Sequence, residues 1–168
     1  MSFQTNILTK KPIFAYIKNI TMIIYNFNTL KDAILFLIKD EQASFDHYNT
    51  LSKKSVNIHI KTVWEQLAND ELRHKATLIE LLNNTEFIAS VYNEKDNIES
   101  IPFIEIDTTA GKIKQIFQTA CNLEIASYNH YINVAKQTPH PQIEQLFLSI
   151  ANEELEHKAM LELELQSL

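Results

Sequence analysis

A glutamate three residues before a histidine occurs twice in this chain, in closely similar surroundings. The stretch "DELRHK" contains Glu71 and His74, and the stretch "EELEHK" contains Glu154 and His157. Carboxylates and imidazoles both bind metal ions, and residues three apart on a helix lie on one face. Each pair could therefore present two ligands to the same point. One such pair is weak evidence, so the interpretation depends on what surrounds the two.

Both pairs belong to a longer internal repeat in which each residue lies 83 positions before its counterpart. The segment "EQASFDHY" at 41–48 aligns with "EIASYNHY" at 124–131, and "ANDELRHKA" aligns with "ANEELEHKA" without a gap. Each half therefore has a further glutamate, Glu41 or Glu124, at the same distance before its Glu-x-x-His pair. This shared register indicates a duplicated helical hairpin, with each copy carrying half of a site.

Apolar residues recur at helical spacing in four segments, which predict helices. The expected ranges are about 30–53, 58–82, 110–136 and 141–166. The roughly 25 residues between the second and third ranges show no clear period, as the long crossover connection of a helical bundle would. We therefore expect an all-α four-helix bundle made from two duplicated hairpins, with a long crossover between helices 2 and 3.

Local signals place the ends of these helices and of the domain. Thr29 and Asn57 are suited to cap the first two helices, and Pro141 suits the first turn of the fourth. We expect one domain at 29–168, preceded by an N-terminal extension at 1–28 that packs on the domain or on a neighbouring subunit.

Composition limits the class of protein. The chain of 168 residues has one glycine and four prolines, and 45% of its residues are hydrophobic, which favours helices with few connections. Its net charge of −6 argues against nucleic acid or an anionic membrane surface as a partner. A single cysteine, Cys121, excludes a disulfide framework within the chain. We expect a cytoplasmic protein.

The repeated polar residues interrupt apolar stripes, so they should point into the bundle. Glu71, for example, lies four residues after Leu67, and His74 lies four residues before Leu78. Buried carboxylates repel each other unless they are protonated or bound to cations, and two divalent metals would neutralise four of them. Oxygen-rich ligation with one imidazole per metal suits iron or manganese better than structural zinc. The predicted metal ligands are Glu41, Glu71, His74, Glu124, Glu154 and His157.

With this ligand set, the chain resembles the rubrerythrin branch of the ferritin-like superfamily over about residues 30–165. The resemblance rests on those six residues and on Tyr48 and Tyr131, each seven residues after a glutamate. It implies that Glu71 and Glu154 bridge two metals and that the other four ligands are terminal. Family members react a ferrous pair with peroxide or dioxygen, or oxidise and sequester iron.

Two departures from the family pattern affect the expected mechanism. Rubrerythrins proper carry a rubredoxin-type iron centre on two Cys-x-x-Cys pairs, which this chain lacks, so its electron donor should be external. Their third helix also carries an extra glutamate, where this chain has Ser127, and Ser44 stands in the other half. The expected site is therefore more symmetric and closer to the ligand set of bacterioferritin.

Four aromatic residues near the predicted ligands have competing interpretations. For Tyr48 and Tyr131 we favour hydrogen bonds to metal-bound carboxylates over a radical role. His47 and His130 lie one residue away from the tyrosine face. For these two histidines we favour packing between helices over direct ligation of a metal.

Four further residues lie within the repeat or near it. Asp70 and Glu153, which precede the predicted bridging glutamates, either hold the ligand imidazoles or face water. Cys121 and Trp64 are expected in the apolar core.

The predicted function is a di-iron oxidoreductase, with di-manganese as an alternative, that reduces hydrogen peroxide or dioxygen while ferrous iron is oxidised. The predicted catalytic residues are Glu71, Glu154, Tyr48 and Tyr131. An external electron donor and a homodimer or larger assembly are expected. The alternatives are ferritin-like iron storage or detoxification, a metal-stabilised interaction module without catalysis, and a hydroxylase with an open substrate cavity.

Overall fold

The computed structural model describes residues 27–84 and 112–168, and four helices account for nearly all of them. They are α1 (Leu30–Lys54), α2 (Ile58–Asn84), α3 (Ile113–Gln137) and α4 (Pro141–Ser167). No strand occurs in these two described segments, so the all-α prediction is confirmed. The expected extension at 1–28 lies almost wholly outside the described residues. So does the expected crossover between α2 and α3.

The predicted capping residues begin the helices as expected. The Thr29 hydroxyl oxygen accepts a hydrogen bond from the backbone N–H of Asp32 at 3.1 Å. The Asn57 side-chain oxygen accepts one from the backbone N–H of Ile60 at 3.2 Å. Pro141 is the first residue of α4, where its missing N–H costs no hydrogen bond.

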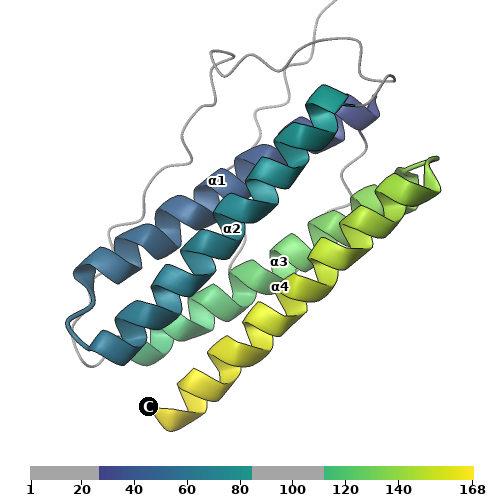
Figure 1. Ribbon diagram of the computed structural model, residues 1–168. Helices are drawn as coiled ribbons and strands as arrows, with labels where there is room; N and C mark the ends of the chain where they lie inside the picture. The colour runs from purple at the N-terminus through teal and green to yellow at the C-terminus, as the bar shows by residue number, and fades with distance from the viewer. Residues whose placement is uncertain (1–26, 85–111) are drawn as a thin grey trace, which may run out of the picture.

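The helices form two antiparallel hairpins that pack against each other. Helix α1 packs against α2, α3 packs against α4, and the hairpins meet partly through α1 and α3. Figure 1 shows α2 and α3 running in the same direction, and α2 and α4 in opposite directions. Parallel α2 and α3 distinguish this topology from a simple up-and-down bundle. None of the described helices is long and apolar enough to cross a membrane.

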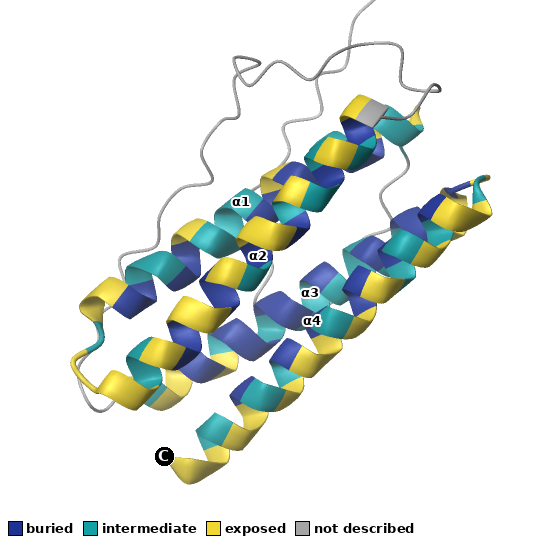
Figure 2. Ribbon diagram, viewed as in Figure 1, coloured by how far each residue is buried: buried dark blue, intermediate teal, exposed yellow. Residues whose placement is uncertain are grey.

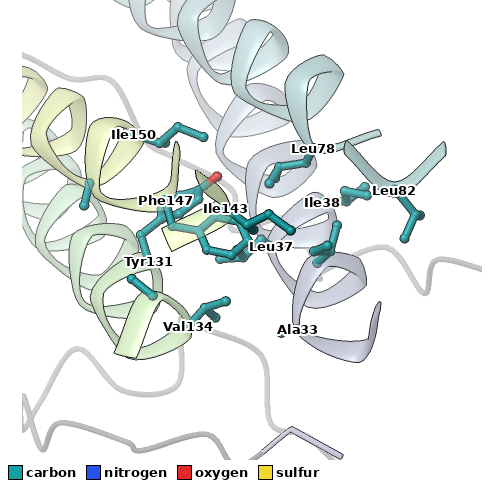
Figure 3. Close-up of a cluster of buried hydrophobic side chains, with 13 residues drawn as sticks. Ala33, Leu37, Ile38, Leu78, Leu82, Tyr131, Val134, Ile143, Phe147 and Ile150 are labelled. Carbon is teal, nitrogen blue, oxygen red and sulfur yellow. The ribbon is translucent and has the colours of Figure 1, made fainter. Parts of the chain in front are cut away.

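Buried residues lie on the faces that the helices turn toward one another (Figure 2). They form two apolar clusters. One cluster joins the start of α1 and the end of α2 to the end of α3 and the start of α4 (Figure 3). The other lies toward the opposite end of the bundle and contains Trp64, Phe117 and Cys121. The predicted metal ligands lie on the helical turns between these clusters, so apolar packing encloses them from both ends.

Because the side chains of the first cluster are fully packed, shortening one of them should lower the stability of the fold strongly. Leu37 is 0% exposed, and replacing it with alanine should lower the free energy of unfolding by about 2–5 kcal/mol because a cavity remains. Urea unfolding of the metal-free protein would measure the change. Val56→Ala is the matched control, because Val56 is 100% exposed and should change stability little. Equal effects of the two variants would contradict this assignment of the core.

Candidate metal centre

The structure brings all six predicted ligands together in the middle of the bundle, and every one of them is buried. They form two overlapping groups that could each hold a metal ion, with ligand atoms within 4.8 Å of one another. The groups are Glu41, Glu71, His74 and Glu154, and Glu71, Glu124, Glu154 and His157. Glu71 and Glu154 belong to both groups, as expected for carboxylates that two metal ions could share.

The two glutamates that belong to both groups also differ in hydrogen bonding from the two that belong to one group. Both carboxylate oxygens of Glu71 and of Glu154 lack a hydrogen-bond partner. Glu41 and Glu124 each leave only Oε2 without one. Buried polar atoms are normally satisfied, so a concentration of unsatisfied oxygens in a closed interior needs a compensating partner. Two cations at the centre would use two oxygens from each shared carboxylate and one from each of the others.

Two tyrosines occupy the remaining oxygens of Glu41 and Glu124. The Tyr48 hydroxyl donates a hydrogen bond to Oε1 of Glu124, and the Tyr131 hydroxyl donates one to Oε1 of Glu41. Burial, followed by the charges of nearby carboxylates, raises the pKa of both phenols well above the ordinary value. Both phenols therefore stay protonated and keep donating. Each bond joins one hairpin to the other.

Asp70 and Glu153 both contact the imidazoles, and neither simply faces water. Nε2 of His74 lies 3.3 Å from a carboxylate oxygen of Glu153, and Nε2 of His157 lies 3.3 Å from one of Asp70. Because an ionised carboxylate only accepts, these contacts favour the tautomer with the proton on Nε2. Nδ1 of each ring has no hydrogen-bond partner. In the neutral ring Nδ1 carries a lone pair, and it faces the carboxylates of the site, 3.1 Å from Oε1 of Glu154 in the case of His74. Metal ligation by Nδ1 therefore requires the imidazole to be neutral.

His47 and His130 do not belong to either group of potential ligands. Nδ1 of His130, on α3, lies 2.6 Å from Oδ2 of Asp40 on α1, so this histidine joins two helices. The ring of His47 packs edge-on against Tyr48, with centroids 5.4 Å apart. Sequence reasoning did not single out Asp40, although it precedes Glu41 directly. The repeat gave no signal, because Leu123 occupies the matching position in the second half.

Trp64 and Cys121 are core residues, as the sequence predicted. Trp64 stacks on Tyr48 with an interplanar angle of 5° and a centroid separation of 5.9 Å. Since Tyr48 hydrogen-bonds Glu124, the single tryptophan lies next to the site. Its fluorescence can therefore report on metal binding.

Without metal, protons must offset the buried negative charge. Burial, followed by repulsion from Glu154 and Glu41, raises the pKa of Glu71 well above its ordinary value. Burial also raises the pKa of Glu124 to about 8, although His157 opposes the shift. For the imidazoles, burial alone would lower the pKa, but the adjacent carboxylates raise it to about 11 for His74 and about 10 for His157. Metal binding must therefore displace protons.

These shifts predict that the metal-free protein loses stability as the pH rises from about 6.5 to 8. His74 and His157 keep protons in the folded state that an unfolded histidine releases above 6.5, and this stabilisation is lost as the pH rises through their folded pKa values. Glu124 acts in the same direction, because an unfolded glutamate releases its proton near 4.5 and the folded one near 8. His47, with its pKa lowered by burial to about 4, opposes the trend only below 6.5.

Thermal unfolding in the presence of a chelator would test this expectation. The melting temperature should fall across the window, and saturating Mn²⁺ should abolish the fall because metal replaces the protons. Glu124→Gln, which cannot ionise at this position, should flatten the decline. A melting temperature independent of pH in the metal-free wild type would contradict the proposed charge state.

Comparison with known proteins agrees with the resemblance found in the sequence. The model of the Rubrerythrin family matches residues 32–165, a segment that includes all six potential ligands. No curated protein and no solved structure matches the chain. Because the family model covers well over half of the sequence, the chain belongs to the rubrerythrin family.

Proposed function

We propose that this protein is a di-iron oxidoreductase that reduces hydrogen peroxide or dioxygen. The observation that carries the proposal is the distribution of buried oxygens without hydrogen-bond partners, two on each shared glutamate and one on each of the others. The residues that would hold the metals are Glu41, Glu71, His74, Glu124, Glu154 and His157. Glu71 and Glu154 would bridge the two ions.

The chemistry of the donors favours iron, with manganese as the alternative. Each potential site offers three carboxylates and one imidazole and no thiolate, a set that suits iron or manganese rather than structural zinc. The four glutamates supply four negative charges against the four positive charges of two divalent ions. Members of the family are di-iron carboxylate proteins, which supports the same choice.

Two ferrous ions at this site would supply the two electrons that, with two protons, convert hydrogen peroxide to two molecules of water. The protein's own groups would manage the protons and the water. Tyr48 and Tyr131 hold their protons beside the terminal carboxylates, at hydroxyls that hydrogen-bond Oε1 of Glu124 and Glu41. Complete burial of these groups excludes bulk water and strengthens each electrostatic contact.

The enclosure of the site favours a small oxidant over an organic substrate. All six potential ligands are at most 6% exposed. A hollow of about 380 Å³ opens between α1 and α2, and its lining includes Phe45, Asn49 and Asn69 but none of the six. Peroxide and dioxygen are small enough to pass between packed helices, whereas a hydroxylase substrate would need an open cavity at the metals. An external donor would then have to supply two electrons to complete the cycle.

An anaerobic ferrous titration of the metal-free protein, followed by addition of oxidant, tests the proposal. We expect saturation near two irons per chain and rapid oxidation on mixing with peroxide or oxygen. Trp64 fluorescence and iron analysis would count the bound ions. Retention of tens of irons per chain would instead indicate storage. Binding of two irons without consumption of oxidant would indicate a metal-stabilised module, and no binding at all would reject the paired site.

Replacement of a shared carboxylate should remove both metals together. Glu71→Ala leaves each group of ligands with one carboxylate fewer, so binding of both irons and rapid oxidation should be lost. Glu156→Ala is the matched control, because this exposed glutamate precedes His157 but belongs to neither group. Oxidation at the wild-type rate in Glu71→Ala would refute the proposed site.

Loss of one tyrosine hydroxyl should slow oxidation while both metals remain bound. In Tyr48→Phe, Glu124 loses its hydrogen-bond donor, and the rate of ferrous oxidation should fall by about 10–100-fold. Stopped-flow absorption would measure the rate, and iron analysis would check occupancy. Tyr128→Phe serves as the control, because Tyr128 packs against the apolar core and belongs to neither group of potential ligands. An unchanged rate in Tyr48→Phe would exclude a role for its proton.

A further inference from the structure

One guanidinium group joins the two carboxylates that contact the site histidines. Nη2 of Arg73 donates to Oδ1 of Asp70 at 3.1 Å, one helical turn earlier on α2. The same nitrogen donates to Oε2 of Glu153 on α4 at 2.5 Å. Arg73 therefore crosses from one hairpin to the other at the level of the candidate metal centre.

Each of these carboxylates also contacts an imidazole of the opposite hairpin. Oε2 of Glu153, which accepts from Arg73, lies 3.3 Å from Nε2 of His74. Oδ2 of Asp70 lies 3.3 Å from Nε2 of His157, while Oδ1 of the same side chain accepts from Arg73. The chain of contacts therefore runs from His74 through Glu153, Arg73 and Asp70 to His157.

The internal repeat shows that Arg73 is not simply a duplicated feature. Position 156 is its counterpart in the second half and carries an exposed glutamate, whereas Asp70 and Glu153 are counterparts of each other. The two acids are thus repeated in both halves, but the arginine that contacts them both occurs in the first half alone.

We infer that Arg73 is a positioning residue for both histidines and sets the metal affinity of the two sites together. This inference rests on the proposed metal pair. By fixing Asp70 and Glu153, Arg73 holds each Nε2–H in place and thereby aims both Nδ1 lone pairs at the centre. Nη2 has two hydrogens, one for each carboxylate, and the rigid guanidinium plane fixes their directions, whereas the ammonium of a lysine rotates freely on a flexible stem.

The exposure of Arg73 separates this role from a contribution to folding. Its side chain is 52% exposed, and Asp70 and Glu153 are also partly exposed, so the ion pairs should add little to the stability of the bundle. The effect of removing Arg73 should therefore appear in metal binding and not in the melting temperature of the metal-free protein.

Titration of the metal-free protein with Co²⁺, followed by Trp64 fluorescence and cobalt absorption, tests the inference. Arg73→Gln should weaken binding of both ions by about 10–100-fold, while the melting temperature without metal stays unchanged. Arg73→Lys should restore part of the affinity. Lys75→Gln is the matched control for loss of one positive charge on α2, because Lys75 hydrogen-bonds Gln42. Its affinity should stay within about twofold of wild type.

A double-mutant cycle then asks whether Arg73 acts through the two acids. In the Asp70→Asn, Glu153→Gln background, Arg73→Gln should cause no further loss of Co²⁺ affinity. An equal loss in that background, or an equal loss in Lys75→Gln, would overturn the inference in favour of a general charge effect. Wild-type affinity in Arg73→Gln would overturn it as well. Failure of the wild type itself to bind two Co²⁺ would instead count against the proposed metal pair.

Discussion

The burial of four carboxylates at one level of a helical bundle is the constraint on which the rest of this structure depends. Glutamates in such an interior repel one another and lose the hydration that stabilises their charge. Two positive agents can relieve the cost, protons or metal ions. The raised pKa values of Glu71 and Glu124 describe the first solution, and the unsatisfied oxygens of the shared glutamates are suited to the second. The fold therefore supports a site whose negative charge must be neutralised by protons or metal ions taken up from solution.

The two hairpins depend on each other at this site. Tyr48 of the first hairpin orients Glu124 of the second, and Tyr131 of the second orients Glu41 of the first. Likewise, Asp70 and Glu153 each contact an imidazole of the opposite hairpin. A single hairpin would carry a Glu-x-x-His pair without the groups that hold it. Because supporting contacts are exchanged between the two copies, a shift of register in either copy would separate donors from acceptors.

Much of the fold and of the candidate site could be predicted because both depend on periodicity. The spacing of Glu41, Glu71 and His74 with their repeat placed the side chains on inward faces, and the structure brings them together. Contacts that obey no repeat could not be found in this way. Asp40 aligns with Leu123 when the two halves are superposed in sequence. The repeat therefore did not indicate its contact with His130. The crossing of Arg73 to Glu153 depends on how the two hairpins are placed against each other, which periodicity does not specify.

The differences between the halves are therefore as informative as the repeat. The set of potential ligands is itself symmetric, so any difference between the two potential metal sites must come from the residues around them. Three differences adjoin the site: an acid at position 40 against a leucine at 123, an arginine at 73 against a glutamate at 156, and a tryptophan at 64 against a phenylalanine at 147. Each changes a charge, a hydrogen bond or an aromatic contact around ligands that the repeat leaves unchanged. Duplication thus supplies the ligands of this site, and divergence around them supplies the differences between its two sides.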